Sequence, residues 1–576
     1  MDKNKKLHLI LCWHMHQPDY RNLLTGEFIL PWTYLHALKD YTDMAWHLEN
    51  SQVKAVVNFV PVLLDQLEDY ARQFEEGEVK DPLLSLLPRP DLENLSVEER
   101  QRILESCFRS DHAKMIEPYP PYRRLHDLYK LVQAPGGPKQ EYLSSQYMAD
   151  LLVWYHLVWV GETVRRNSDL LPRLMAQGTG FSAEDRRRLY DLLGTLIRDL
   201  IGRYRKLAKS GRVELSTTPY HHPIAPLLID FKCARDSAPD TALPESAFYP
   251  GGRTRVVSHI QAALDSHRHR FGEKAVGMWP AEGGVSMETL RLMADQGVHW
   301  AATGQGVLAN SLRSGSHSAA LPDKNAYLYR PYRLDGIKNF VCFFRDDVLS
   351  DLIGFEYAKW YGSDAVHHFI HQLEEIWRHT PAGEEPVVSV IMDGENAWEY
   401  YPYNGYYFLS GLYAALEKHP YIRTTTFRDY LEECVPGKDT PPCPVEGQLP
   451  RLVAGSWVYG NFSTWIGDPA KNRAWDLLCA AKASFDMVMA SGRLTEAEQA
   501  AARNHLSDCE GSDWFWWFGD YNPAISVGSF DKLFRDNLAI LHRLLKLPVP
   551  AELSRPICRG ASGEMVEAGG TMRRAT

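Results

Sequence analysis

Three carboxyl groups stand where two predicted strands end, in segments far apart along the chain. Asp393 and Glu395 follow the uncharged run 387–392, and Glu282 follows the run 275–279. Uncharged, β-branched runs of this kind are typical of parallel strands covered on both faces. In α/β barrels, catalytic groups gather at the carboxyl ends of such strands. An isolated Asp-Gly-Glu is more often an ordinary turn, but the same pattern recurs in this chain.

A pair of acids on one rim is what cleavage of a glycosidic bond requires. One acid acts as nucleophile or base, and the other has a raised pKa and protonates the leaving oxygen. The sequence therefore predicts that Glu282 and Asp393 face each other across a gap the size of a sugar. Sixteen Trp and 29 Tyr residues would suit stacking on sugar rings as well as core packing.

Histidines follow two other predicted strands, in the segments 14–17 and 221–222. Side chains at positions i and i+2 of a strand share a side, so His14 and His16 could bind a metal ion or donate hydrogen bonds to hydroxyl groups. Taken alone, the motif is explained about as well by polar loop residues whose hydrogen bonds are satisfied within the protein. Glu214 lies inside its predicted strand, where a buried carboxylate needs a partner.

Strands and helices alternate along most of the chain. Predicted strands cover 7–13, 54–60, 212–218, 275–279, a run from 299, 340–344 and 387–392, and predicted helices cover 147–164, 183–211, 287–296 and 369–379. Ser182 and Ser286 are predicted helix caps. This alternation indicates an α/β protein with a parallel sheet closed, or nearly closed, into a barrel. One rim would then hold every polar cluster.

The helical pattern dominates after about residue 430. The predicted units are a barrel domain (1–430) with a helical insertion (about 81–140), a mainly helical domain contributing to the cleft (431–559) and a disordered tail (560–576). A linker is predicted at 436–444. The aromatic segment 510–519 is expected to pack against the barrel mouth.

Composition argues against several classes of protein. With 63 basic and 73 acidic residues the net charge is −10, which disfavours a nucleic-acid or anionic-membrane surface. No stretch is as long as a membrane span. Nine irregularly spaced cysteines indicate reduced thiols, and no signal peptide follows the basic start, so a cytoplasmic protein is expected.

Five ordered segments resemble the motifs of glycoside hydrolase family 57. They are His14-Met-His-Gln-Pro18, Gly211-Arg-Val-Glu214 with His221-His222-Pro223, Trp279-Pro-Ala-Glu282, Asp393-Gly-Glu395 and Ser512-Asp-Trp514. The stretches 220–228 and 513–517 are most similar to the α-amylase and amylopullulanase branch of that family. Each short motif is weak alone, but five in the right order, spanning 14–517, are a strong signal.

The resemblance implies an incomplete (β/α)7 barrel of the TIM-like class followed by a helical domain, acting on α-glucans with retention of configuration. By motif position, Glu282 would be the nucleophile and Asp393 the general acid/base, with carboxyl groups roughly 5 to 5.5 Å apart. Residues expected to bind substrate are His14, His16, Gln17, His221, His222, Trp279, Asp513, Trp514 and Trp516. Glu214, Arg345, Asp346 and Glu395 could each bind substrate. It is an equal alternative that each only orients the residues that do.

The resemblance also leaves alternatives open. No cofactor or metal is expected, and the expected partner is an intracellular α-glucan such as glycogen or maltodextrin. The same intermediate would serve a 4-α-glucanotransferase or a branching enzyme. A zinc enzyme related to deacetylases or α-mannosidases could use His14, His16, His221, His222 and Asp393 as ligands. A non-catalytic glucan-binding protein is the third alternative.

Overall fold

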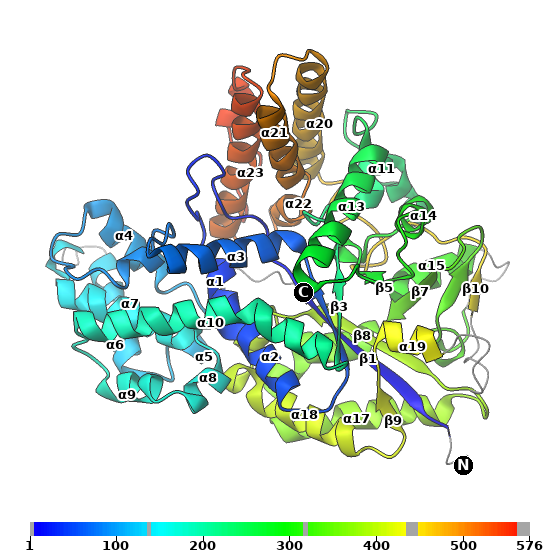
Figure 1. Cartoon of the computed structure of the whole chain (residues 1–576), viewed down its shortest axis with the longest axis horizontal. Coiled ribbons are helices and arrows are strands. Elements are labelled where there is room, and N and C mark those ends of the chain that lie inside the picture. Colours follow the sequence, from blue (N-terminus) through cyan, green and yellow to red (C-terminus); the bar gives the residue numbers. More distant parts are fainter. Residues whose placement is uncertain (1–4, 135–139, 315–320, 434–446, 562–576) are drawn as a thin grey trace.

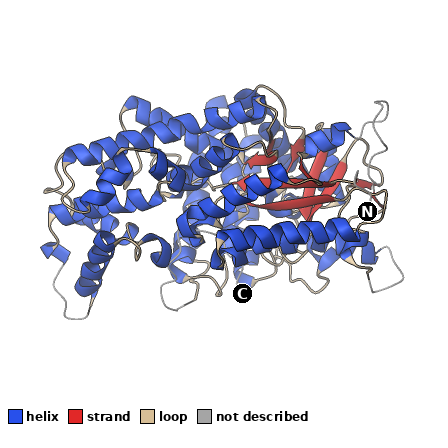
Figure 2. Cartoon of the chain, turned by 90° about the horizontal axis from the view of Figure 1, so that it is seen from below, coloured by secondary structure: helices blue, strands red, loops and turns tan. Residues whose placement is uncertain are grey.

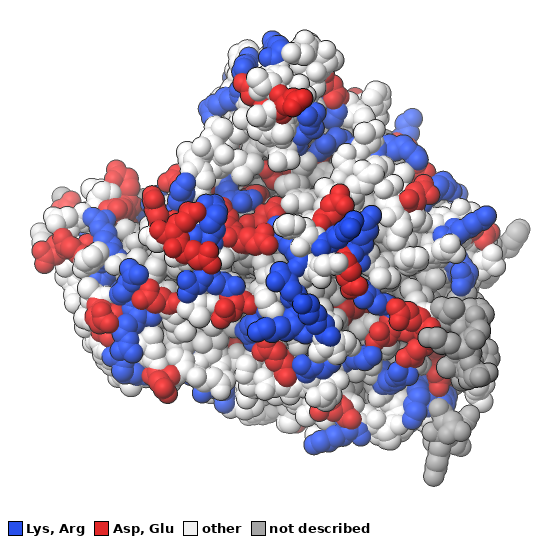
Figure 3. Space-filling model, in the orientation of Figure 1, with Lys and Arg blue, Asp and Glu red and all other residues white. Residues whose placement is uncertain are grey.

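The computed structural model describes residues 5–134, 140–314, 321–433 and 447–561 (Figure 1). The linker predicted at 436–444 and the tail from 562 onward lie outside these ranges. Within them, none of the helices combines the length and the apolar composition that crossing a membrane requires. Basic and acidic side chains are interspersed over the face shown in Figure 3.

Seven parallel strands form a barrel. They are β1 (Leu7–Met15), β2 (Ala55–Phe59), β3 (Val213–Thr217), β4 (Gly277–Met278), β5 (Trp300–Gly304), β7 (Val341–Arg345) and β8 (Val387–Asp393). Neighbours pair in the order β8-β1-β2-β3-β4-β5-β7, and one residue pair, Arg345 with Ser389, joins β7 to β8. Because β4 has two residues and closure rests on one pair, the barrel is of the incomplete seven-stranded type, and this prediction is confirmed.

Three short strands extend the sheet outside the ring. They are β6 (Tyr332–Leu334), antiparallel to β7, β9 (Ile422–Thr424), parallel to β1, and β10 (Gly447–Leu449), parallel to β6. Every residue of β1 and the first six residues of β8 are buried, which explains why their sequences carry so little charge. The barrel interior is apolar and aromatic, and it includes Trp279, Trp300 and Phe427.

Helices surround the barrel, as Figure 2 shows. They are α1 (Trp32–His36), α2 (Thr42–Glu49), α3 (Pro61–Glu76), α10 (Ala183–Lys209), α11 (Ala225–Ile229), α12 (Ala234–Ser237), α13 (Gly252–Phe271), α14 (Met287–Asp295), α15 (Gln305–Ser314), α16 (Asp347–Asp351), α17 (Gly362–His379), α18 (Tyr406–Lys418) and α19 (Phe427–Glu433). Ser182 opens α10 with a capping box, and Ser286 accepts a hydrogen bond from the Thr289 amide at 3.2 Å, so both predicted caps are confirmed.

Two further helical groups flank the barrel in Figure 1. The first, at the left, contains α4 (Val97–Ser106), α5 (His112–Met115), α6 (Pro120–Gln133), α7 (Ser145–Trp159), α8 (Glu162–Asn167) and α9 (Leu170–Gln177). The second, at the top, contains α20 (Pro469–Ala490), α21 (Glu496–Cys509), α22 (Asp513–Trp517) and α23 (Ala524–Leu544).

A buried charge cluster ties the second group to the barrel. Glu510, after α21, accepts hydrogen bonds from Arg255 at 2.7 Å, His259 at 2.7 Å and Tyr249 at 2.5 Å. Burial alone would raise the pKa of Glu510, but the Arg255 charge and the His259 bond outweigh it and hold that pKa well below its usual range. This ionised cluster fixes α13 against α21 and so positions α22 beside the barrel mouth.

Candidate active site

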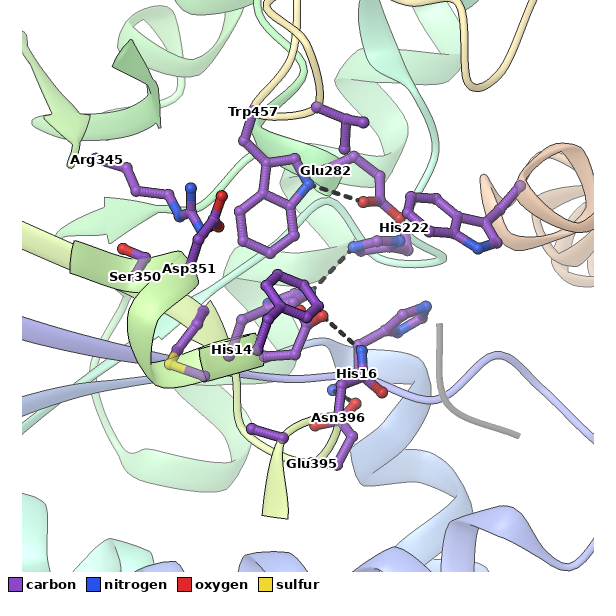
Figure 4. Close-up of a pocket in the computed structure, with 17 residues that line it drawn as sticks. His14, His16, His222, Glu282, Arg345, Ser350, Asp351, Glu395, Asn396 and Trp457 are labelled. Atoms are coloured by element: carbon purple, nitrogen blue, oxygen red, sulfur yellow. Dashed lines mark hydrogen bonds and ion pairs between the residues drawn. The ribbon is translucent and has the colours of Figure 1, made fainter. Parts of the chain in front are cut away.

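A cavity of about 810 Å³ opens at the carboxyl ends of the barrel strands. Figure 4 shows its lining residues converging from strand ends that are far apart in sequence. The predicted residues that line it are His14, His16, His222, Glu282, Arg345, Asp393, Glu395 and Trp516.

Glu282 and Asp393 approach this cavity from opposite sides of the ring. Glu282 follows β4 and Asp393 ends β8, and these strands are separated by β5 and β7 in one direction and by β3, β2 and β1 in the other. Both side chains line the same cavity. The two acids therefore line one cavity at the same end of the barrel.

The backbone at Glu282 is strained. Its φ is 55° and that of Gly283 is 57°, and a left-handed conformation is costly for a residue that carries a Cβ. Trp457 holds this turn, because its amide donates to the Glu282 carbonyl at 3.2 Å and its indole Nε1 donates to Glu282 Oε2 at 3.1 Å. A Cβ at Gly283 would lie 3.2 Å from the Trp457 backbone nitrogen, so this glycine makes room for the contact.

Asp393 is positioned by the pairing of β8 with β1, in which it stands opposite His14. The Gly394 amide donates to the His14 carbonyl at 2.7 Å, and a Cβ at Gly394 would clash with the Met15 sulfur. The glycine is therefore required by a close approach of two strands. Asn396 Nδ2 donates to Asp393 Oδ2 at 2.6 Å.

Both acids have raised pKa values. Burial is the main cause for Glu282, and the negative charges of Asp393 and Asp513 add to it. Burial also raises the pKa of Asp393 to about 6, although the Asn396 hydrogen bond and the nearby His16 and Arg345 charges lower it in part. Glu282 is buried and Asp393 is half-buried in one cavity, so the two carboxyl groups resist carrying two charges and titrate as a pair that holds one proton over an intermediate pH range.

The histidines of the cavity form a hydrogen-bonded chain. Asn58 Oδ1 lies 2.7 Å from His14 Nδ1, His14 Nε2 lies 3.1 Å from His222 Nε2, and His222 Nδ1 lies 2.8 Å from Ser512 Oγ. The Asn58 amide is itself oriented, because its Nδ2 donates to Ser216 Oγ at 2.9 Å and its Oδ1 accepts from Thr218 Oγ1 at 2.8 Å.

This chain fixes the tautomers of both rings. Asn58 Oδ1 is an acceptor, so His14 carries its proton on Nδ1 and accepts at Nε2. His222 must then donate from Nε2 and accept at Nδ1 from the Ser512 hydroxyl. Burial lowers the pKa of His14 to about 3, with His16 adding to the effect, and lowers that of His222 for the same reasons. Both rings are therefore neutral.

His16 has a different environment from its two neighbours. Its Nε2 lies 2.9 Å from Asp513 Oδ1, and its ring stacks on His222 with centroids 3.8 Å apart. Its Nδ1 is buried and has no hydrogen-bond partner within the described residues.

One cluster among the described residues has the spacing of metal ligands, namely His16, His222 and Asp513, whose ligand atoms lie within 4.8 Å of one another. His222 Nε2 carries the proton donated to His14, so in this hydrogen-bonding pattern it has no lone pair for a metal. A transition metal would have to displace that proton and break the chain. The zinc alternative therefore fits the observed hydrogen bonds poorly.

Several predicted residues lie outside the cavity. Glu214 is in the barrel interior, where it accepts from Trp300 Nε1 at 2.9 Å and from the Arg428 amide at 2.8 Å. Burial raises its pKa to about 7. Asp346 caps α16 through the Leu349 amide at 3.0 Å and also binds Tyr329. The contacts of Glu214 and Asp346 therefore favour a role in supporting the structure over a role in binding substrate.

His221 points away from its neighbour His222. The φ of His222 is 58°, which turns the chain so that His221 enters a separate cavity and lies 2.6 Å from Asp508. Burial opposes protonation of His221, but the Asp508 charge outweighs it and raises the pKa. The expectation that His221 contacts the same ligand as His222 is not supported by this placement.

The remaining predicted residues, apart from Arg345, lie around the cavity without lining it. Gln17 donates to Glu395 Oε1 at 3.4 Å, and Trp279 packs beneath Trp457 with centroids 5.2 Å apart. Asp513 holds His16, while Trp514 is buried against Phe530 and donates to the Asp508 carbonyl at 3.0 Å. Arg345 lines the cavity but binds Asp347 and Asp351, with its guanidinium 5.2 Å from the Trp457 ring centroid.

The sequence did not point to Trp457, Asn58 or Phe355. Trp457 and Phe355 line the cavity, and Asn58 sets the tautomer of His14. A weak signal for Trp457 was present, since it lies in the run Gly455-Ser-Trp-Val-Tyr-Gly460, where two glycines bracket two aromatic residues. Asn58 is a polar residue inside an otherwise apolar strand, and that feature could have marked it.

Residues 10–441 match the model of the family described as glycosyl hydrolase family 57. No curated protein matches the chain significantly. Three solved structures share its fold. They are a branching enzyme from Thermococcus kodakaraensis (16% identity, TM-score 0.57, 93% of this chain and 90% of that chain), a branching enzyme from Pyrococcus horikoshii (15%, 0.56, 97% and 98%) and an α-amylase from Thermotoga maritima (12%, 0.52, 94% and 93%).

The family match extends over most of the chain and includes β1 through β9, which carry the cavity. It contains four of the five motif segments, and the fifth, at 512–514, contacts two histidines of that cavity, because Ser512 binds His222 and Asp513 binds His16. The chain therefore belongs to glycosyl hydrolase family 57 and is an enzyme of the glycoside hydrolase type.

Proposed function

We propose that this enzyme cleaves α-1,4-glucosidic bonds of α-glucans and retains the configuration of the anomeric carbon. The observation that carries the proposal is the placement of Glu282 and Asp393 on opposite sides of one buried cavity, both with raised pKa values. A retaining mechanism needs one ionised and one protonated acid, which is the one-proton state of such a pair.

In the first step, the Glu282 carboxylate attacks the anomeric carbon as the bond to the leaving oxygen breaks, and Asp393 gives its proton to that oxygen. In the second step, water attacks the same carbon, Asp393 takes a proton from it, and the bond to Glu282 breaks. The Trp457 indole hydrogen bond supports the ionised form of Glu282. The neutral His14 and His222 rings add no positive charge where the reacting sugar develops its own.

The choice of an α-glucan rests on the family and on the aromatic lining. The structures that share this fold are described as branching enzymes and an α-amylase. Trp457 and Trp516 offer indole faces to the cavity, and such faces stack on the apolar faces of glucose rings. The seven cysteines within the described ranges are all free, which favours an intracellular glucan such as glycogen or maltodextrin over an extracellular one.

Transfer to a second sugar is the other candidate function. A sugar hydroxyl would replace water in the second step, as in a 4-α-glucanotransferase or a branching enzyme. The similarity to two branching enzymes over almost the full length of both chains favours keeping this candidate.

The products formed from maltoheptaose distinguish the two candidates. Hydrolysis should give only shorter oligosaccharides, whereas transfer should also give longer ones. Proton NMR during the first minutes should show α-anomeric products. Early β-anomeric products would contradict the retaining mechanism, and no cleavage of maltoheptaose, amylose or glycogen would contradict the proposed substrate class.

The substitution Asn58→Asp should change the pH dependence of this reaction. A carboxylate 2.7 Å from His14 Nδ1 would stabilise the His14 cation and raise its pKa from about 3. Activity should then be lost at acid pH and recover as the pH rises and His14 loses its proton. We expect kcat to fall about 10- to 100-fold near the acid limb, the usual effect of losing a positioning partner.

Asn472→Asp, remote from the cavity on α20, is the matched control. A purely structural role for Asn58 would lower activity by the same factor at every pH, and that outcome would contradict the proposed effect on the His14 tautomer.

A further inference from the structure

Five exposed aromatic side chains lie on the segments 355–361 and 403–407, which follow β7 and β8 in the chain. They are Phe355, Trp360, Tyr361, Tyr403 and Tyr407, with exposed fractions of 37%, 40%, 84%, 57% and 54%. We call this set the aromatic strip. Exposed large aromatic side chains in such a group often mark a binding surface.

The topology places the strip on the same end of the barrel as the acids. Helices α17 and α18 flank β8 in sequence and pack side by side (Figure 1). Each runs opposite to the parallel strands, so its first residues lie at the carboxyl ends of the strands. Tyr361 caps the start of α17, and Tyr407 is the second residue of α18.

The members of the strip are linked to each other and to the cavity. Phe355 lines the cavity itself. At the other end, the Tyr403 and Tyr407 rings are 5.5 Å apart. A Cβ on Gly362, next to Tyr361, would lie 3.3 Å from Tyr407 Cβ, so α17 and α18 touch at this point. The strip therefore continues outward from the cavity.

Two of the rings are held in place while remaining exposed. Tyr403 and Asn404 have φ values of 53° and 52°, and Gly405 follows with 71°, a run of left-handed residues that costs energy to maintain. Arg166 donates to the Tyr407 hydroxyl at 3.1 Å, and its guanidinium lies 5.2 Å from the centre of that ring. Rings fixed in advance lose little conformational entropy when they bind a ligand.

We propose that the aromatic strip binds a second stretch of the α-glucan chain, outside the catalytic cavity. This inference rests on the proposed function. Glucose rings present apolar faces edged by hydroxyl groups, which suits separate aromatic rings interleaved with polar side chains such as Arg166, Lys359 and Ser363. A protein partner would instead favour a continuous apolar patch with few charges at its centre. The strip thus favours long glucans over short ones.

Binding to glycogen in the Glu282→Gln background tests this site without turnover. The double variant Tyr361→Ala/Tyr407→Ala should weaken glycogen binding in affinity electrophoresis at least about tenfold, because it removes two stacking rings. Tyr142→Ala, at an equally exposed tyrosine on the helical flank, is the matched control and should leave binding unchanged.

The same double variant in the active enzyme provides the second readout. Its kcat/KM for maltoheptaose should be unchanged and its kcat/KM for glycogen should fall. Unchanged glycogen binding, or an equal loss on both substrates, would overturn the inference and leave the strip to another kind of partner. If the wild-type enzyme cleaves no α-glucan, the proposed function fails. The comparison of glycogen binding still tests the aromatic strip, because it does not depend on turnover.

Discussion

Glu282→Gln should abolish turnover, lowering kcat on maltoheptaose by a factor on the order of 10⁴ to 10⁶, the range seen when a catalytic nucleophile is removed. The amide cannot form the covalent bond to the anomeric carbon, although it keeps the size of the carboxyl group and can still accept from the Trp457 indole. The substrate should still bind. Steady-state kinetics together with binding of maltoheptaose measure both effects.

Glu214→Gln is the matched control, because it makes the same change at a buried carboxyl group outside the cavity. The amide oxygen can still accept from Trp300 Nε1, so activity should stay within about tenfold of the wild type. Azide added to Glu282→Ala should restore cleavage of an activated substrate and give a β-glycosyl azide, because the small anion attacks in place of the missing carboxylate. Equal losses at residues 214 and 282 would argue that a structural effect is being measured.

Asp393→Ala should lower kcat on maltoheptaose by about 10²- to 10⁴-fold, the range for removal of a general acid/base. Substrates whose leaving group needs no proton, such as a dinitrophenyl glycoside, should lose much less in the first step. The second step should then be slow, so the glycosyl-enzyme should accumulate. Burst kinetics with the activated substrate measure both steps.

The protonation of Asp393 also determines how the activity changes with pH. Burial raises the pKa of Asp393 to about 6, so the carboxyl group is protonated below that pH and ionised above it. Because the first step needs the protonated form, kcat/KM in the wild type should fall as the pH rises through about 6. The fall should be absent in Asp393→Ala. If this variant keeps the alkaline limb, another group supplies the proton.

The strand ends were the part of the molecule that sequence reasoning could predict well. Uncharged runs ending in polar residues identified β1, β4 and β8, because a strand buried on both faces carries little charge until it leaves the core. The pairing of Asp393 with His14 follows from that arrangement. A barrel of parallel strands, with polar groups at one rim, could therefore be predicted from these runs, whereas the incomplete seven-stranded type was implied by the family resemblance.

Contacts that depend on a single turn or on distant packing could not be derived in this way. His221 and His222 are neighbours in sequence, yet the left-handed backbone at His222 sends them into different cavities. Trp457 reaches Glu282 from a segment beyond the barrel strands, and this requires the space left by Gly283 and Gly304. Neither effect has a periodic pattern that the sequence would display.

Trapping of the covalent intermediate tests the central claim most directly. Incubation of Asp393→Ala with an activated 5-fluoro-α-glucosyl or 2-fluoro-maltosyl donor should add one sugar to the protein, and peptide mass spectrometry should place that sugar on Glu282. A sugar attached to another residue would contradict the proposed roles of the two acids. Complete turnover without a covalent adduct, giving products of inverted configuration, would contradict the retaining mechanism itself.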